Sequence, residues 1–390
     1  MTLVAVPIFV DTSADIADAH AAAAAAAAAG ATLVEWRVDR LGDEDAADAA
    51  VRRLLAGSPL PAILTCRSVA EGGHAEDPAR ALALLAAATR AESPPRYVDL
   101  ELTLTDHPAA AAVIDGIAAS GEIGLLLSTH DFDGRPPDLL QRIERMTTHP
   151  HAAVVKVAWM ARSLRDNLEA FDLLHARRTP TIALCMGPFG LPSRVLAGKF
   201  GGLITFASSA PGAESAPGQP TLADLEQCGF ERVGDATRVY GVIGWPIGHS
   251  RSPTLHNAVF RQMEWDGVYL PLPVPPEWEH FKATVGAWVD HPTLGFRGAS
   301  VTLPHKTHLV RFVRERGGVV GPEASAIGAA NTLVVGDDDA IACVNTDVPA
   351  LRATLLAGMR TDTLAGRRVL VLGAGGVARA AVFAAATAGG

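Results

Sequence analysis

A single lysine interrupts the apolar run Ala152-Ala153-Val154-Val155-Lys156-Val157-Ala158-Trp159. A short apolar run rich in valine is typical of a strand that is buried on both faces, as strands of parallel sheets are. A lysine inside such a strand loses hydration, and this loss favours the uncharged amine over the ammonium. The run therefore indicates a parallel sheet and, within it, an amine nucleophile that works near neutral pH.

Similar strand-like runs recur through the first part of the chain, and each is followed by an alanine-rich or amphipathic stretch of helical length. The strand-like runs lie near residues 3–10, 32–39, 62–68, 97–102, 122–130, 152–159, 181–186 and 203–208. The helical stretches lie near residues 13–29, 43–56, 76–90, 107–120, 136–147, 163–177, 191–198 and 221–227. Eight strand–helix units in about 230 residues predict a TIM barrel, a closed parallel sheet surrounded by helices.

Polar side chains stand late in these predicted strands, at the end of a barrel where functional groups gather. Glu35, Arg37 and Asp39 alternate with apolar residues and are therefore expected to face one side of their strand. A structural ion-pair cluster is the alternative interpretation of this triplet. His130 ends the run before that of Lys156, and an amine beside a histidine base predicts Schiff-base chemistry with proton abstraction next to a carbonyl.

Composition narrows the class of protein. The 390 residues suggest two domains, and the net charge of −9 argues against a nucleic-acid-binding surface. Four widely separated cysteines form no C-x-x-C pair, so neither a disulfide framework nor a metal site is predicted. The alanine run 21–29 reads as a surface helix rather than a membrane span. The N-terminus enters a strand directly without a signal-peptide pattern, so we expect a cytoplasmic protein without membrane partners.

Residues 1–232 resemble type I 3-dehydroquinate dehydratase. The matching motifs occur in family order and cover the whole predicted barrel. They are Glu35-Trp36-Arg37-Val38-Asp39, Thr65-Cys66-Arg67-Ser68 with Glu71-Gly72-Gly73, Ser128-Thr129-His130-Asp131-Phe132, Lys156, Met186-Gly187 with Ser193-Arg194, and Ser215-Ala216-Pro217-Gly218-Gln219.

This resemblance implies a mechanism for the barrel. Lys156 is expected to condense with the C3 ketone of 3-dehydroquinate, and His130 to remove a C2 proton and then protonate the departing C1 hydroxyl. Glu71 is expected to orient His130. The resemblance further implies that Arg194 holds the substrate carboxylate. The other substrate contacts that it implies are Glu35, Arg37, Arg67, Ser215 and Gln219. The resemblance implies no metal and no cofactor for this reaction.

A second part of the chain begins near Thr237, where a predicted strand over 238–244 leads into a helix that starts near residue 254. Ser250 and Ser252 precede that helix and could form a cradle for a carboxylate, although Ser252 could equally be a plain helix cap. Lys306 and Asp347 come from separate loops and could share a proton-transfer task. The alternative is a surface lysine and an unrelated turn residue.

Near the end of the sequence, the apolar run 369–372 leads into a glycine-rich turn and then a predicted helix. Strand, glycine-rich turn and helix in this order are typical of the phosphate loop of a dinucleotide-binding domain. The residues expected to hold the cofactor are Gly373, Ala374, Gly375, Gly376, Val377 and Ala378.

From residue 238 onward the sequence resembles shikimate dehydrogenase. The resemblance implies a substrate-binding domain over 238–362 and the first unit of an NADP-binding Rossmann domain over 365–390. Ser250 and Ser252 would bind the shikimate carboxylate, and Lys306 and Asp347 would form the catalytic pair. Thr302 and Asn331, with Asp347, would hold ring hydroxyls. The tandem order is similar to fused dehydratase–dehydrogenase enzymes, in which 3-dehydroshikimate passes from the first reaction to the second.

Three departures from the dehydrogenase pattern are visible. Ser300 stands where the family usually has asparagine, and Pro349-Ala350 stands where a glycine is common. The sequence given stops at Gly390, one helix after the glycine-rich turn, so the strand that reads the NADP 2′-phosphate is not in it. We therefore expect residues 365–390 to pack poorly and the chain to reduce 3-dehydroshikimate slowly or not at all.

The sequence also allows other functions. The barrel could be a class I aldolase-type Schiff-base lyase, and the C-terminal part could be a binding module without catalysis. Arg37, Arg67 and Arg194 instead favour a polyhydroxylated carboxylate as the substrate. The predicted partners are thus the small molecules 3-dehydroquinate and 3-dehydroshikimate, and the sequence predicts no particular oligomeric state.

Overall fold

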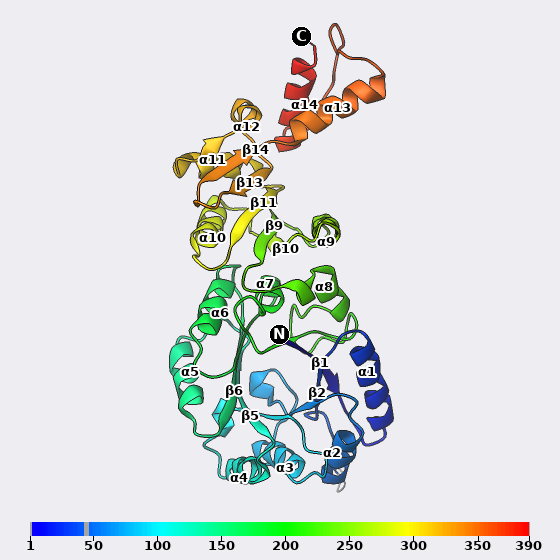
Figure 1. Cartoon of the computed structure of the whole chain (residues 1–390), viewed down its shortest axis with the longest axis vertical. Coiled ribbons are helices and arrows are strands. Elements are labelled where there is room, and N and C mark those ends of the chain that lie inside the picture. The colour runs from blue at the N-terminus through cyan, green and yellow to red at the C-terminus, as the bar shows by residue number, and fades with distance from the viewer. Residues whose placement is uncertain (1, 43–46, 390) are drawn as a thin grey trace. The chain divides into compact units, whose positions relative to one another are not determined.

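The computed structural model describes residues 2–42 and 47–389 (Figure 1). The chain divides into two compact units. One consists of Met1–Arg162 and Asp166–Asp235, and the other of Ser163–Arg165 and Ala236–Gly390. The expected separation of residues 365–390 from 238–362 as a further domain stays a prediction.

Eight parallel strands form the sheet of the first unit. They are β1 (Leu3–Phe9), β2 (Leu33–Arg37), β3 (Ala62–Thr65), β4 (Tyr97–Glu101), β5 (Gly124–Asp131), β6 (Ala152–Met160), β7 (Thr181–Met186) and β8 (Ile204–Phe206). Their order is β7-β6-β5-β4-β3-β2-β1-β8. The amide of Leu203 donates to the carbonyl of Thr181 over 3.0 Å, so the two ends of the sheet meet and the barrel is nearly closed.

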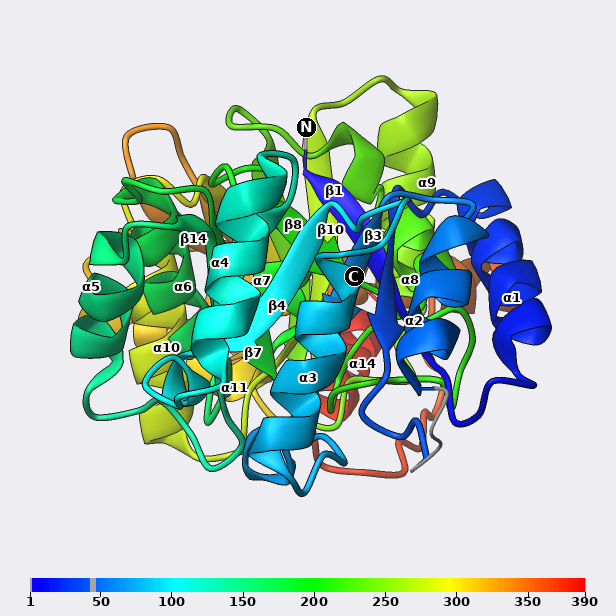
Figure 2. The ribbon, with the colours of Figure 1, turned by 90° about the horizontal axis from the view of Figure 1, so that it is seen from below.

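Helices follow the strands and surround the barrel (Figure 2). They are α1 (Ile16–Ala28), α2 (Ala47–Ala56), α3 (Pro78–Ala88), α4 (Ala110–Ser120), α5 (Leu139–Thr148), α6 (Asp166–His175), α7 (Leu191–Val195) and α8 (Leu222–Gln227). The predicted alternation of strand and helix is confirmed, and with it the TIM barrel. Residues 43–46 of the predicted helix 43–56 lie outside the described residues.

Alternation along the strands divides the barrel interior into layers. One inward residue of each strand contributes to a buried apolar cluster, namely Ala5, Leu33, Ile63, Tyr97, Leu126, Val154, Ile182 and Ile204. Because side chains two residues apart share a face, the next inward layer begins two residues later on every strand. On five strands that position is polar, and we call these residues the polar layer: Glu35, Thr65, Asp99, Ser128 and Lys156. The apolar cluster thus forms the floor on which the polar layer stands.

The second unit contains a mixed six-stranded sheet of order β10-β9-β11-β13-β14-β12. Its strands are β9 (Arg238–Gly244), β10 (Gly267–Pro273), β11 (Phe296–Val301), β12 (Val319–Val320), β13 (Thr332–Val335) and β14 (Ile341–Val344). Its helices are α9 (Ser252–Gln262), α10 (Trp278–Asp290), α11 (Lys306–Glu315), α12 (Pro322–Ile327), α13 (Asp347–Met359) and α14 (Gly376–Thr387). The predicted α/β architecture of this part is confirmed.

The predicted strand over 369–372 does not form. Leu370 is 83% exposed and Leu372 is 88% exposed, and no described strand lies beside them. A strand requires a neighbour that accepts and donates its backbone hydrogen bonds, and local sequence cannot supply one. The helix that follows, α14, does form and packs on α13 through Val348, Ala380 and Ala384. No helix among the described residues has the length and apolar character needed to cross a membrane.

Candidate active site

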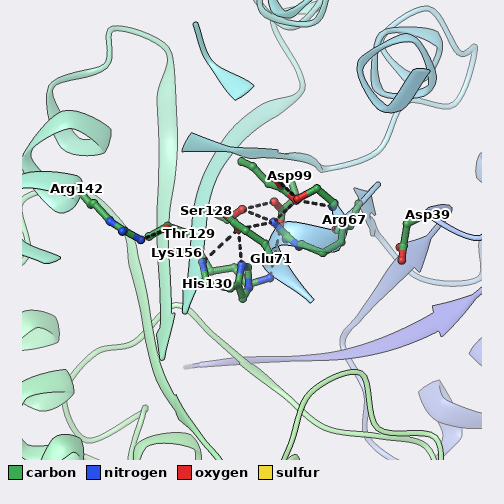
Figure 3. A network of polar contacts seen from close by, with 12 residues as sticks. Asp39, Arg67, Glu71, Asp99, Ser128, Thr129, His130, Arg142 and Lys156 are labelled. Atoms are coloured by element: carbon green, nitrogen blue, oxygen red, sulfur yellow. Dashed lines mark hydrogen bonds and ion pairs between the residues drawn. The ribbon is translucent and has the colours of Figure 1, made fainter. Parts of the chain in front are cut away.

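The polar layer places Lys156 among carboxylates rather than in an apolar setting (Figure 3). Its Nζ lies 3.2 Å from Asp99 Oδ2 and 3.6 Å from Glu35 Oε1. The ring of Phe206 lies 4.4 Å from the same nitrogen. Lys156 is only 5% exposed, so these neighbours replace the water that burial removes.

Arg67 connects the acidic side chains of this site. Its guanidinium donates to Asp99 Oδ2 over 2.7 Å and to Ser128 Oγ over 2.8 Å. It also lies 3.3 Å from Glu71 and 3.4 Å from Glu101. Although burial disfavours its charge, Asp99, Glu71 and Glu101 raise the pKa of Arg67. A permanent cation therefore stands between several buried carboxylates.

His130 and Glu71 form a hydrogen-bonded pair. Nδ1 of His130 lies 2.9 Å from Glu71 Oε2, and the backbone amide of His130 donates to the same oxygen over 3.2 Å. Burial raises the pKa of Glu71 to about 8. Burial, together with the charges of Arg67 and Lys156, holds the pKa of His130 well below its ordinary value. Because Oε2 already acts as an acceptor, Nδ1 carries the hydrogen and Nε2 keeps its lone pair.

Two buried donors of this site lack acceptors within the part of the chain that the structure describes. Arg194 Nε and Gln219 Nε2 have no hydrogen-bond partner among the described residues. Burial lowers the pKa of Arg194 to about 10. The other end of the Gln219 amide is held, since its Oε1 accepts from the amide and the hydroxyl of Ser215. Buried donors without acceptors are costly, so a ligand that offers oxygen atoms fits here.

The buried carboxylate of Asp39 holds the guanidinium of Arg37 in place. Its Nε donates to Asp39 Oδ1 over 2.8 Å, and its Nη2 donates to Oδ2 over 3.1 Å. Although burial opposes it, Arg37 holds the pKa of Asp39 below its ordinary value. The expected cluster Glu35, Arg37 and Asp39 thus divides: the first two line the cavity, and Asp39 anchors Arg37.

One cavity at the carboxyl ends of the barrel strands brings the predicted residues together. Its lining includes Glu35, Arg37, Arg67, Glu71, His130, Lys156, Arg194, Ser215 and Gln219. The sequence interpretation did not include Asp99, which contacts both Lys156 and Arg67. The signal was present, because Asp99 and Glu101 alternate within an otherwise apolar strand.

A second cavity, in the second unit, contains the other predicted group. Its lining includes Ser250, Ser252, Thr302, Lys306, Asn331 and Asp347. Lys306 Nζ lies 2.6 Å from Asp347 Oδ2, and Asn331 Nδ2 donates to Asp347 Oδ1 over 3.0 Å. The alternative of an unrelated surface lysine and turn residue is therefore wrong, because the two side chains form an ion pair.

The serines of this cavity precede and open helix α9. The N-cap position is Arg251 rather than Ser252, so the plain-cap alternative for Ser252 is wrong. Ser252 already belongs to the first helical turn, and its backbone amide donates a hydrogen bond to Ser250 Oγ over 3.3 Å. Ser300 also lines the cavity and accepts a hydrogen bond from the hydroxyl of Tyr269 over 2.7 Å.

The glycine-rich turn lies against the same lysine. A cavity lined by residues 371–379 also includes Thr302 and Lys306. A Cβ atom on Gly376 would lie 2.9 Å from Cδ of Lys306, so a larger residue would displace that side chain. The turn and the start of α14 fit a phosphate group, whereas the strand that normally supports such a turn is not formed. Among residues 2–42 and 47–389 no group of His, Cys, Asp or Glu is arranged to hold a metal ion.

Known proteins match each unit separately and both together. Residues 4–230 match the type I 3-dehydroquinase family, and residues 242–333 match the shikimate dehydrogenase substrate binding domain. A bifunctional 3-dehydroquinate dehydratase/shikimate dehydrogenase of Arabidopsis thaliana is 33% identical over an alignment of 377 residues that covers 91% of this chain and 59% of that protein. A shikimate dehydrogenase (NADP(+)) of Paramagnetospirillum magneticum is 44% identical over 152 residues, 39% of this chain and 52% of that protein.

A solved structure agrees with the barrel. The 3-dehydroquinate dehydratase of Geobacillus kaustophilus HTA426 is 25% identical with a TM-score of 0.50, and the match covers 58% of this chain and 89% of that one. The chain spans less than two thirds of the length of the curated relatives described above. Since the family match extends over more than half of the sequence, the chain belongs to the type I 3-dehydroquinase family.

Proposed function

We propose that the barrel dehydrates 3-dehydroquinate to 3-dehydroshikimate through a Schiff base on Lys156. The observation that carries this proposal is the shared cavity in which the Lys156 amine meets the His130–Glu71 pair. The relatives named for the same activity support it. An amine and a neutral imidazole at one cavity provide the nucleophile and the base that this reaction requires.

The first step forms the covalent bond. The ammonium of Lys156 gives up one proton within the site, and the resulting amine attacks the C3 ketone. The carbonyl oxygen takes up that proton and a second one from Nζ and leaves as water, and a protonated imine joins Nζ to C3. This cation withdraws electrons from C2 and so makes the C2 hydrogens acidic. Burial of Lys156 keeps bulk water away from Nζ and so protects the imine from early hydrolysis.

The second step removes water from the substrate. Nε2 of His130 takes a C2 proton, and the electron pair moves toward the imine nitrogen. The electrons then return to form the C1–C2 double bond as the C1 hydroxyl leaves, and His130 gives that hydroxyl its proton. Glu71 holds the imidazole in place through the hydrogen bond at Nδ1 during the two transfers. Hydrolysis of the imine releases 3-dehydroshikimate and restores Lys156.

Arg194 and Gln219 are proposed to orient the substrate. Both carry a buried donor that has no acceptor among the described residues, and the substrate carboxylate and hydroxyls supply acceptors. Arg37 and Ser215 complete this wall of the cavity.

We propose in addition that the second unit binds 3-dehydroshikimate and takes part in its reduction to shikimate. Its support is the cavity that joins Lys306, Asp347 and Asn331 with Ser250 and Ser252. Lys306 and Asp347 would move a proton to the substrate oxygen, and the serine hydroxyls would bind its carboxylate. NADP(H), when bound, supplies the hydride, and residues 373–378 would hold its phosphates.

Borohydride trapping tests the barrel reaction. Reduction in the presence of 3-dehydroquinate is expected to leave a stable adduct on Lys156, identified by peptide mass mapping, whereas sugar phosphates leave none. The matched control is Lys156→Ala, which is expected to form no adduct and no product. Normal turnover by Lys156→Ala, or an adduct formed with sugar phosphates but not with 3-dehydroquinate, would contradict the proposal.

A further inference from the structure

Asp99 lies next to Lys156 but outside the lining of the cavity. Its side chain is fully buried. Oδ2 lies 3.2 Å from Lys156 Nζ and accepts from Arg67 over 2.7 Å, while Oδ1 accepts from the Ser128 hydroxyl over 2.6 Å. Lys156 and Arg67 at Oδ2 and Ser128 at Oδ1 together hold this carboxylate in one orientation.

The charge of Asp99 is stable. Although burial opposes it, Arg67 and Lys156 hold the pKa of Asp99 below its ordinary value. The hydroxyl of Ser128 and the guanidinium of Arg67 act only as donors to it, so both contacts favour the ionised form. Asp99 therefore stays an anion near neutral pH and is not suited to accept a proton from Lys156.

The charge on Nζ is conserved when the imine forms. An ammonium and a ketone give a protonated imine and water, so one positive charge stands on Nζ before and after the step. An anion that is fixed beside the ammonium is therefore already in place for the protonated imine, and no reorganisation is needed. Only the protonated imine withdraws electrons strongly enough to acidify C2.

We infer that Asp99 is a catalytic residue whose carboxylate is the counterion of the protonated imine on Lys156. This inference rests on the dehydratase activity proposed above. The carboxylate keeps the imine nitrogen protonated at the pH at which His130 is neutral and able to act as a base. Without this counterion, a buried imine would lose its proton more readily, because burial disfavours the charged form.

Glu35, the other carboxylate near Lys156, is less suited to this task. It stands 3.6 Å from Nζ, beyond hydrogen-bond distance, and it accepts from the Thr65 hydroxyl over 2.9 Å. Glu35 also lines the cavity, so its carboxylate faces the substrate side. Asp99 is the carboxylate that accepts a hydrogen bond from Lys156 among the described residues.

The Asp99→Asn variant tests the inference, since it keeps the shape of the side chain and removes its charge. We expect kcat to fall about 100-fold or more, by analogy with the loss of one preorganised electrostatic contact. The basic limb of the kcat–pH profile is expected to move to lower pH, because the imine then keeps its proton only in more acidic solution. A purely structural role would lower activity at every pH without moving this limb.

Two further variants give the controls. Ser128→Ala keeps the carboxylate and removes one of its donors, so a small loss of kcat with an unmoved basic limb is expected. Glu35→Gln is expected to leave the basic limb in place as well. If Glu35→Gln moves that limb, Glu35 is the counterion and the inference fails, even where Asp99→Asn does not fold.

Measurements on the wild-type chain distinguish a failure of the proposed dehydratase function from a failure of the role inferred for Asp99. If it forms no adduct with 3-dehydroquinate, the proposed function fails. If it forms the adduct and turns over, but folded Asp99→Asn keeps the wild-type kcat and the wild-type basic limb, only the role of Asp99 is overturned.

Discussion

The barrel site and the second-unit site use a lysine beside a carboxylate in different surroundings. In the barrel, the side chains of Lys156 and Asp99 are 6% and 0% exposed, and further charged groups surround them. In the second unit, the side chains of Lys306 and Asp347 are 13% and 25% exposed and come from the starts of two helices. Burial makes the barrel charges strongly dependent on one another, whereas solvent screens the second pair.

The secondary structure beneath the barrel site is also more complete than that beside the second-unit site. Every strand of the barrel is paired, so the polar layer stands on a continuous apolar floor. The segment 369–372 beside the second site pairs with none of the described strands, and its leucines are exposed. A nucleophile can be held firmly in the first setting, whereas a cofactor loop in the second lacks its usual support.

The largest expected effect is the loss of one activity without any change at the other site. Lys156→Ala should abolish dehydration of 3-dehydroquinate, a loss of at least about 10⁴-fold, because no other amine among the described residues lines the cavity. Binding of shikimate to the second unit, measured by calorimetry, should not change. Lys306→Ala is the mirror control and should leave the dehydratase rate unaltered; a loss of both functions in either variant would show that the sites are not independent.

The next largest effect is expected at His130, the proposed general base. His130→Ala should still trap the imine with borohydride but eliminate water about 10²- to 10⁴-fold more slowly. Rapid-quench measurement of adduct formation and of product gives the two rates separately. A His130→Ala variant with a wild-type dehydration rate would show that another group removes the C2 proton.

The pairing of His130 with Glu71 predicts a smaller effect. Glu71→Gln keeps an acceptor for Nδ1–H, whereas Glu71→Ala removes it, so the alanine variant should lose about 10-fold more activity than the glutamine variant. Equal losses would show that the charge of Glu71, rather than its hydrogen bond, matters. Both variants should retain a cooperative thermal transition.

The pH dependence follows from the lowered pKa of His130. A histidine whose pKa is lowered stays neutral, and therefore active as a base, at pH values below the ordinary 6.5. The acidic limb of kcat/KM for the wild-type barrel is thus expected below pH 6.5 rather than at it. A limb at or above pH 6.5 that persists in Glu71→Gln would show that the imidazole is not shielded as the structure indicates.

The barrel could be predicted from sequence because each of its strand–helix units carries a local signal. Runs such as 152–159 are apolar, and the helical stretches that follow are amphipathic or rich in alanine. The candidate site followed, because its motifs stand late in the strands. Asp99 was missed although it alternates with Glu101, because a carboxylate that contacts only other protein groups has no motif of its own. The strand at 369–372 was predicted wrongly because its formation depends on a partner strand, which a local pattern does not reveal.

The smallest expected effects concern the second site. Ser250→Ala and Ser252→Ala should each weaken shikimate binding about 5- to 10-fold, which lies in the range of one ordinary hydrogen bond. NADPH-dependent reduction of 3-dehydroshikimate should be slow in the wild-type chain, because the exposed segment 369–372 does not support residues 373–378 beside Lys306. Calorimetry with shikimate and absorbance of NADPH measure the two separately. Tight substrate binding with slow reduction would place the weakness in the cofactor loop, whereas rapid reduction would show that the loop is ordered by the cofactor itself.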